Sequence, residues 1–352
     1  MKILITGVGG PTPRSFVNAL KLFSDYSNYE FIATDINPLA IGLYQQNLFT
    51  KSYLVPPASD NSYWEVIEHI IKKNKIEYAV ILPELEVLEW SKKQDEGKLP
   101  CKVLLPDHQL AQFLVDKAKM TDVLKAIDVV PKSVEFSRDD TKLETIGKQL
   151  GYPYWVRSTS GSSGLGSLKI EAVDSLKNWI QINPNVDQFL ASTYLPGRNL
   201  ACKLLYFEGK LVRAAVGERV NYIMAKVAPS GITGNTSFGR LLNEPHIVAI
   251  AIEAMEKMFE HTNAQQHGFF TVDLKEDAKG KAYITEINVR HVAFTQCFAA
   301  GGANFAEDTL RLLDQDAAFD KDFAIYEFEK DLIFLRDVDE RPIIMKEYEL
   351  LK

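Results

Sequence analysis

Three polar residues alternate along one strand-like segment near the end of the chain. In AYITEINVRH, residues 282–291, Glu286, Asn288 and Arg290 occupy every second position. Because successive side chains of a β-strand point to opposite faces, these three share one face. The other face takes the apolar residues Tyr283, Ile287 and Val289. An acid, an amide and a guanidinium on one face form either a solvated surface or a binding site.

A second carboxylate, Asp273 in FFTVDL, lies on the preceding strand-like segment. A hairpin loop at residues 277–280 predicts that Asp273 pairs with Ile284 and shares the polar face of Glu286. Oxygen ligands of this kind suit Mg²⁺, which binds one or two carboxylates together with substrate phosphates. Arg290, further along, suits a phosphate oxygen. The alternatives are a solvated strand face, or a register shifted by one residue that turns Asp273 away.

Two glycine-rich loops compete as a phosphate site. The first, TGVGGPTPRS, follows an N-terminal strand and precedes a helix, with Asp35 at the end of the next strand, which is the context of a dinucleotide fingerprint. That fingerprint needs glycine where Thr12 stands, and Pro11 and Pro13 remove two backbone donors. A tight strand-to-helix turn without a nucleotide is the alternative.

The second loop is RSTSGSSGLGS, which Arg157 opens on a strand. Its hydroxyls, its free N–H groups and the close backbone approach that glycine allows all suit phosphate oxygens. The loop has no GK[ST] and precedes a strand, so it is no Walker A loop. A flexible surface hairpin is the alternative. The candidate contacts are Ser160, Gly161, Ser162, Ser163 and Gly164.

Composition limits the classes of function. The 352 residues, 46% hydrophobic and 25% charged, predict a globular protein of two or three units. A net charge of −7 with interspersed Lys and Arg argues against nucleic-acid binding. Three widely separated cysteines indicate neither a disulfide framework nor a zinc site. We expect no signal peptide and no membrane span, hence a cytoplasmic protein, with a homodimer as the default.

The elements that carry these residues change character along the chain. Strand and helix patterns alternate over the first hundred residues and predict a doubly wound parallel sheet. Hairpin-linked strands then predict antiparallel α+β units, and residues 245–262 predict an amphipathic helix. We predict irregular strand from about residue 320.

In chain order, VDKAKM, PYWVRSTSGSSGLGS, STYLPGRNLACKL, GFFTVDL and ITEINVR resemble an ATP-grasp enzyme with its preceding substrate domain. The nearest resemblance is to one ATP-grasp unit of the carbamoyl-phosphate synthase large subunit, and it spans roughly residues 1–315. It implies an α/β, Rossmann-like pre-ATP-grasp domain followed by a two-part α+β module. The implied ranges are 1–105 for the first domain, 106–190 and 191–320 for the two subdomains, and 321–352 for a C-terminal extension.

The resemblance also implies roles for single residues. Lys117 and Arg157 are similar to the basic residues that contact nucleotide phosphate, and Thr193, Tyr194 and Leu195 match the hinge whose backbone pairs with adenine. Asp273, Glu286 and Asn288 match magnesium ligands, and Arg290 matches the arginine that steadies the transferred phosphoryl group. The sequence departs from the family at Thr193 and Asn199, where glutamates are usual, and at Asp273, where Glu or Gln is commoner. The implied cofactors are ATP and Mg²⁺, with Mn²⁺ as an alternative metal.

The implied reaction is ATP-dependent ligation of a carboxylate to an amine or similar nucleophile through an acyl phosphate. Arg219, Lys226 and Arg240 flank the loop APSGITGNTSFG, which folds over the substrate in this interpretation and is otherwise solvated. Glu84 or Glu86 could meet an amine, or simply belong to a helix end. The rival hypotheses are an NAD(P)-dependent oxidoreductase that uses the first glycine loop, and a nucleotide-binding protein without turnover.

Overall fold

The structure is a computed structural model that describes residues 1–24, 29–141, 143–161, 166–337 and 351. Its N-terminal part is a five-stranded parallel sheet in the order β3-β2-β1-β4-β5. The strands are β1 (Lys2–Thr6), β2 (Glu30–Asp35), β3 (Lys51–Leu54), β4 (Tyr78–Val80) and β5 (Lys102–Val103). The predicted doubly wound domain is therefore confirmed.

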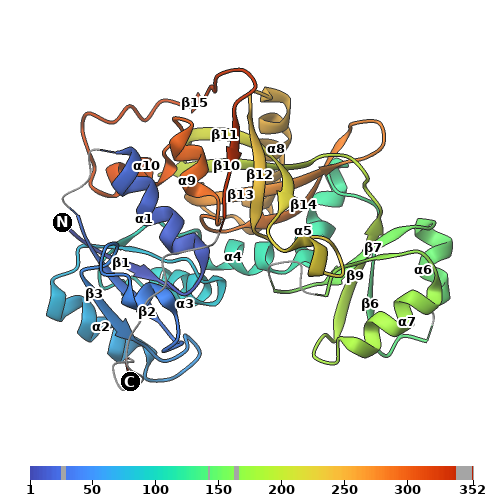
Figure 1. Cartoon of the computed structure of the whole chain (residues 1–352), viewed down its shortest axis with the longest axis horizontal. Helices are drawn as coiled ribbons and strands as arrows, with labels where there is room; N and C mark the ends of the chain where they lie inside the picture. The colour runs from blue at the N-terminus through green and yellow to red at the C-terminus, as the bar shows by residue number, and fades with distance from the viewer. Residues whose placement is uncertain (25–28, 142, 162–165, 338–350, 352) are drawn as a thin grey trace.

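Helices cover both faces of this sheet (Figure 1). Alternate strand residues explain the arrangement, because Leu4 and Ile32 pack with α2 and α3 while Ile3 and Phe31 pack with α1. The helices are α1 (Pro11–Phe23), α2 (Tyr63–Asn74) and α3 (Glu84–Asp95). The strand β3 escaped the sequence analysis: its segment KSYL has two polar residues and lies at the sheet edge.

A second, four-stranded antiparallel sheet in the order β6-β9-β7-β8 forms the small lobe at the right of Figure 1. Its strands are β6 (Ser133–Ser137), β7 (Tyr154–Ser158), β8 (Leu168–Ile170) and β9 (Gln188–Thr193), and its helices are α6 (Leu143–Leu150) and α7 (Val173–Ile182). The helices α4 (His108–Val115) and α5 (Lys117–Leu124) connect the N-terminal sheet to this lobe.

The third sheet is the largest and runs β14-β13-β10-β11-β12-β16, with β15 beside β11. Its strands are β10 (Asn199–Phe207), β11 (Lys210–Tyr222), β12 (Thr236–Leu242), β13 (Gly268–Glu276), β14 (Ala282–Asn288), β15 (Ala324–Ile325) and β16 (Ile333–Leu335). The predicted turn between β10 and β11 is present, and Glu208 and Gly209 adopt φ of 48° and 89° there.

Helices lie on both faces of this large sheet as well. The predicted amphipathic helix is α8 (Pro245–Thr262), and it packs with Leu200, Cys202 and Leu204 of β10. The opposite face, which includes Ala201 and Leu205, packs with α9 (Thr295–Ala300) and α10 (Phe305–Leu313). Short 3₁₀ turns are η1 (Ile41–Tyr44), η2 (Lys125–Ile127) and η3 (Ala225–Val227).

Two short segments of the predicted C-terminal extension join this sheet, because β15 pairs with β11 and β16 pairs with β12. The predicted domain boundaries stay predictions. None of the described helices is long and apolar enough to cross a membrane.

Candidate active site

The carboxylates of the sequence analysis face each other across two neighbouring strands. Asp273 on β13 is directly opposite Glu286 on β14, and Thr271 is opposite Asn288. The predicted pairing of Asp273 with Ile284 was wrong. Ile284 pairs with Leu274 instead, because the register shifts between Asp273 and Leu274. The prediction that the two carboxylates share one sheet face is correct.

A β-bulge explains the changed register. Between Ile284 and Glu286 the strand holds one extra residue, Thr285, whose hydroxyl donates to the carbonyl of Asp273 at 3.1 Å. A bulge re-aims the side chains beyond it. Ile284 therefore turns into the core with Ile287, while Tyr283, which was predicted on the core face, is only half-buried.

The two carboxylates occupy an environment that is short of water. Burial, with a further contribution from Glu286, raises the pKa of Asp273 to about 6, whereas Arg219 acts in the opposite direction. Arg219 Nη1 and Asn288 Nδ2 both donate to Asp273 Oδ2 at 3.3 Å. Asp273 Oδ1 is buried and accepts from no described residue. A buried carboxylate oxygen without a protein partner is suited to bind a cation.

The residues present fit Mg²⁺. Asp273, Glu286 and Asn288 offer oxygen ligands on one sheet face, and Asp273 Oδ1 is unpartnered within the described residues. The described part of the chain contains no cluster of three or more His, Cys, Asp or Glu side chains that could hold a metal. A magnesium ion here would therefore take its remaining ligands from an amide, from water and from nucleotide phosphate.

The facing wall comes from the small lobe and from α5. On β7, Tyr154 and Val156 point into the lobe, whereas Trp155 and Arg157 line the cavity that faces the large sheet. Burial lowers the pKa of Arg157, and Glu286 and Asp273 counteract that shift. Its Nε is buried without a described partner. Arg157 therefore presents a buried guanidinium to the space between the sheets, with its Nε free of described partners.

Lys117 bridges the two walls. Asp116 caps α5 by accepting from the N–H groups of Ala118 and Lys119 at 3.0 and 3.1 Å. This cap fixes Lys117 at the first helical position, where its Nζ donates to the Gly161 carbonyl at 2.6 Å and lies 3.4 Å from Glu286 Oε1. The predicted phosphate residue and the predicted metal ligand are therefore neighbours.

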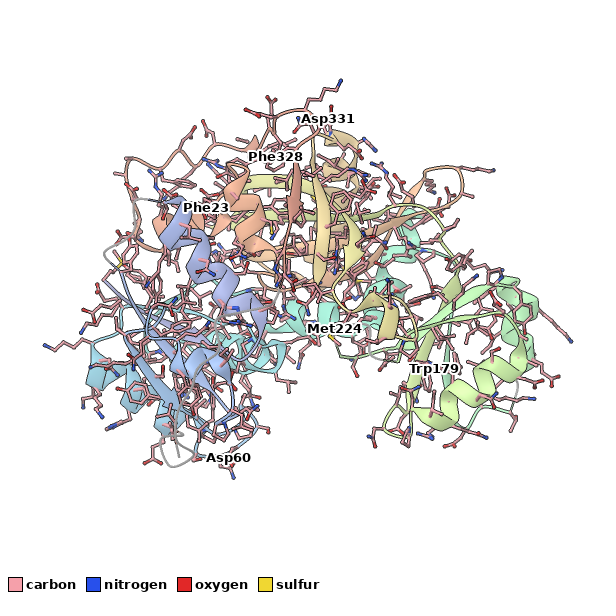
Figure 2. All side chains as sticks on the ribbon, in the orientation of Figure 1. Phe23, Asp60, Trp179, Met224, Phe328 and Asp331 are labelled. Carbon is pink, nitrogen blue, oxygen red and sulfur yellow. The ribbon has the colours of Figure 1, made fainter. Side chains whose placement is uncertain are left out.

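The predicted glycine loop is described only at its ends. Gly161 lines the space between the sheets, whereas Ser160 is exposed and does not. At the far end, Trp179, labelled in Figure 2, donates from Nε1 to the Gly166 carbonyl at 2.9 Å. The remaining predicted contacts, Ser162, Ser163 and Gly164, lie outside the described residues.

The predicted hinge lies at the other end of the same space. Thr193 ends β9, and its N–H donates to Lys132 O at 2.9 Å. Tyr194 and Leu195 line the cavity, and their backbone N–H groups donate to no described residue. Asn199 is adjacent, and its side-chain oxygen accepts from Lys275 Nζ at 3.0 Å.

Arg290 and Glu84 approach the carboxylates from the end of β14 and from the N-terminus of α3. Arg290 donates from Nη1 to the His291 carbonyl at 3.1 Å, and its Nε is buried without a described partner. Burial raises the pKa of Glu84, and the nearby charges of Arg290 and Lys117 counteract this. An acid of the N-terminal domain thus lies near the charges of the large sheet.

A cavity of about 250 Å³ contains most of the predicted site. Lys117, Arg157, Gly161, Thr193, Tyr194, Leu195, Asn199, Asp273, Glu286, Asn288 and Arg290 all line it. Sequence reasoning missed Trp155, Ser167, Tyr222, Lys275 and Phe294, which also line it. The period of two around Arg157 could have found Trp155. The other four come from separate segments and carry no local signal.

The three basic residues around residues 228–239 have different positions. Arg219 lines the cavity, is largely buried, and binds Thr236 Oγ1 at 3.0 Å and Gly234 O at 2.9 Å. Lys226 and Arg240 are exposed, and Arg240 pairs with Glu218 at 2.8 Å. Met224, which lies just before this loop, is labelled near the centre of Figure 2, between the N-terminal sheet and the small lobe.

In the first glycine loop, backbone donors form hydrogen bonds with Asp35 of the neighbouring strand. Asp35 accepts from the N–H groups of Gly9 and Asn37 at 2.7 and 2.9 Å, so both of its oxygens are occupied by backbone. A ribose hydroxyl would have to compete with these bonds. The geometry therefore favours the tight-turn interpretation.

No protein-family model and no curated protein matches this sequence. Solved structures do match. An L-amino acid ligase from Bacillus licheniformis is 16% identical, with a TM-score of 0.63 over 89% of this chain and 74% of the other. The biotin carboxylase domain of Hydrogenobacter thermophilus 2-oxoglutarate carboxylase, in complex with MgADP, ADP and bicarbonate, is 15% identical, with a TM-score of 0.65 over 90% and 70%. The chain has the ATP-grasp fold.

A third structure with this fold is N5-carboxyaminoimidazole synthetase from Staphylococcus aureus in complex with ADP, 16% identical, with a TM-score of 0.62 over 82% of this chain and 70% of the other. The cavity described above lies between the two antiparallel sheets of this chain. The narrower likeness to carbamoyl-phosphate synthase stays a prediction.

Proposed function

We propose that this chain is an ATP-dependent ligase that joins a carboxylate to an amine. The observation that carries the proposal is a set of buried charged atoms from two facing sheets that have no partner among the described residues: Arg157 Nε from the small lobe, and Asp273 Oδ1 and Arg290 Nε from the large sheet. Burying such groups costs free energy unless a ligand satisfies them. A triphosphate with its metal supplies both signs of charge that these atoms require.

The reaction has two steps. A carboxylate oxygen of the substrate attacks the γ-phosphorus of ATP, the bond to the β–γ bridging oxygen breaks, and ADP leaves. The amine nitrogen then attacks the acyl carbon, the carbon–oxygen bond to phosphate breaks, and the amine loses a proton as phosphate departs. Neither step needs a protein nucleophile, because positioning and charge neutralisation lower both barriers.

Each group of residues has a defined task in this proposal. The free N–H groups of Tyr194 and Leu195 bind the adenine edge, and Asn199 is placed for the ribose. Lys117 and Arg157 hold phosphate oxygens against the large sheet, and Arg290 faces the transferred group. Asp273, Glu286 and Asn288 would hold Mg²⁺. That ion, when bound, neutralises charge on the phosphates.

A ligand-binding experiment tests the first half of the proposal. ATP or ADP with Mg²⁺ should raise the melting temperature of the protein, and NADH should not. A larger shift with NADH would contradict the proposal and favour an oxidoreductase. A screen of carboxylate and amine pairs for release of ADP and phosphate tests the second half.

Nucleotide binding without turnover is the second candidate. It is favoured by Thr193 and by Asn199, which replace the usual glutamates of the hinge, and by the bond that ties the Asn199 side chain to Lys275 at 3.0 Å. Stabilisation by MgADP combined with no ADP release for any substrate pair would select this candidate.

A further inference from the structure

A fully buried lysine lies in the large sheet and takes no part in the reaction described above. Lys203 on β10 is 0% exposed. Its Nζ lies 4.8, 5.0 and 5.5 Å from the ring centroids of Phe298, Phe294 and Phe269, and donates to Thr295 Oγ1 at 3.3 Å. None of the described carboxylates lies within ion-pair distance of this Nζ. Aromatic faces attract a cation but leave its charge uncancelled.

The position of Lys203 in the sheet puts its ammonium beside the proposed metal site. Ala201 of β10 lies opposite Asp273 of β13. Two residues further along β10, Lys203 lies opposite Thr271, which itself lies opposite Asn288. Side chains two residues apart on a strand share a face, and diagonal positions on neighbouring strands are roughly 7–8 Å apart. Lys203 and Asp273 are therefore diagonal neighbours on the face that carries the proposed metal ligands.

The ring of Phe294 gives a second, independent placement of the ammonium. Its centroid lies 5.0 Å from Lys203 Nζ and 5.4 Å from Arg219 Cζ, so the ring contacts both cations. Arg219 Nη1 in turn lies 3.3 Å from Asp273 Oδ2. Phe294 lines the cavity, whereas Lys203 does not. The protein itself thus separates the ammonium from any phosphate in the cavity.

The carboxylates of the site face more cations than they can pair. Arg219 lies 3.3 Å from Asp273, Lys117 lies 3.4 Å from Glu286, and Lys203 adds a third positive charge beside these pairs. Arg219 and Lys117 line the cavity, so a bound nucleotide can share their charge. Lys203 has no such alternative. Its positive charge therefore acts on the carboxylates whether or not a nucleotide is bound.

The pKa values reflect this mutual influence. Burial lowers the pKa of Lys203 to about 7, Cys297 and Asp273 act against that shift, and Arg219 adds to it. Lys203 is in turn one of the charges that oppose the rise in the pKa of Asp273 that burial causes. At pH 6.5 the ammonium is therefore mostly protonated, while Asp273 is mostly ionised.

We propose that Lys203 is a positioning residue of the metal site: its fixed charge weakens the binding of a lone divalent cation, so that the metal enters together with nucleotide phosphate. This inference rests on the proposed function and specifies how its metal site is loaded. A cation alone meets the repulsion of the ammonium in surroundings that are poor in water. A metal–nucleotide complex does not, because its phosphates carry more negative charge than the ion cancels.

The test uses Mn²⁺ as the probe, at pH 6.5. Electron paramagnetic resonance measures free Mn²⁺ and so gives the affinity for the ion alone, and calorimetry gives the affinity for preformed MnADP. Lys203→Met fills the aromatic site with an uncharged side chain that packs well against rings. It should bind Mn²⁺ alone at least tenfold more tightly than the wild type, and MnADP within threefold of it. A purely structural role of Lys203 predicts weaker binding of the ion.

Three further variants separate charge from packing. Lys210→Met removes an equal charge from an exposed position on β11 and should bind Mn²⁺ as the wild type does. Thr295→Val removes the hydrogen bond to Lys203 but keeps the ammonium, so its Mn²⁺ affinity should stay within twofold of the wild type. Lys203→Gln is a second neutral replacement, which keeps a partner for Thr295 and should tighten Mn²⁺ binding as Lys203→Met does.

The failures are distinguishable. Unchanged or weaker Mn²⁺ binding in folded Lys203→Met or Lys203→Gln, with MnADP still bound, overturns this inference and leaves the ligase proposal standing. Equal tightening in Thr295→Val or Lys210→Met overturns the assignment to the charge of Lys203. If circular dichroism shows that neither Lys203 variant folds, the ammonium serves stability and the inference is likewise overturned. Failure of the wild type to bind MnADP overturns the proposed function itself.

Discussion

The glycine-rich turn at residues 7–10 and the wall of the cavity are both rich in hydrogen-bonding groups, but only the turn satisfies them internally. In the turn, Gly7 and Val8 donate to Thr34 O at 2.8 and 3.2 Å, and Gly9 donates to Asp35. In the cavity, the buried atoms Arg157 Nε and Asp273 Oδ1 have no described partner. A glycine pattern therefore indicates a ligand site only where its donors stay free.

The largest expected effect concerns the wall of the cavity. Glu286→Gln removes one of the paired carboxylates and should lower ATP turnover by a factor of about 1,000, equivalent to roughly 4 kcal/mol of transition-state stabilisation. Its side chain is a quarter exposed, so the variant should stay folded. Turnover at several Mg²⁺ concentrations checks the effect, and circular dichroism checks the fold. Full activity in the variant would remove Glu286 from the site.

Much of the fold could be predicted because local patterns and tertiary structure agree. The apolar strands of the N-terminal sheet, the turn at Glu208 and the stripe on α8 each carry their signal within a few residues. The strand β3 could not be predicted, because at a sheet edge its polar residues need no burial.

The candidate site could be predicted only in part. The alternation of Glu286, Asn288 and Arg290 indicated the polar face, and the structure retains it. The bulge at Thr285 was not predictable, since the pairing of β13 with β14 sets it rather than any residue preference. Phe294 also lacked a signal, because its segment reaches the cavity only through the tertiary packing of the large sheet.

Glu86 of α3, whose pKa the charge of Asp35 affects, is a buried acid with a pH-dependent effect on stability. Burial is the main cause that raises the pKa of Glu86 to about 7, and the charge of Asp35 contributes. Its stabilising contribution is therefore complete below about pH 4.5 and is lost as the pH rises through about 7. Between those limits the wild type should lose about 3 kcal/mol of unfolding free energy through this group.

Urea unfolding at pH 4.5 and pH 8 measures that loss. Glu86→Gln should reduce the difference between the two pH values by about 3 kcal/mol. Glu65→Gln, which removes an exposed carboxylate of α2, should keep the wild-type difference. An unchanged difference in Glu86→Gln would show that Glu86 ionises normally in the native state.

Two arginines, Arg157 in the cavity wall and Arg213 on β11 with its donors satisfied by backbone carbonyls, should respond in opposite ways. Arg157→Met removes a buried guanidinium without a described partner, so MgADP affinity should fall about tenfold, which is roughly 1.4 kcal/mol, while the unfolding free energy is kept. Arg213 donates to the carbonyls of Asp322 and Asp320 at 2.7 and 2.6 Å, remote from the cavity lining. Arg213→Met should lower the unfolding free energy by roughly 1–2 kcal/mol and leave MgADP affinity unchanged. Loss of stability without loss of affinity in Arg157→Met would reverse the assignment.

The smallest effect tests whether the glycine turn is truly closed. Asp35→Asn replaces a carboxylate that accepts from Gly9 and Asn37, and should lower the unfolding free energy by about 1 kcal/mol because the single amide oxygen can accept only one of the two bonds. The measurement belongs at pH 5, where Glu86 is mostly protonated and the charge of Asp35 acts little on it. Gly9→Ala should act in the same direction, since a Cβ there would lie 3.0 Å from Ala40 Cβ. Neither change should alter MgADP affinity. If Asp35→Asn instead weakened nucleotide binding at unchanged stability, the turn would be a nucleotide site, and satisfied donors would no longer separate a structural glycine loop from a functional one.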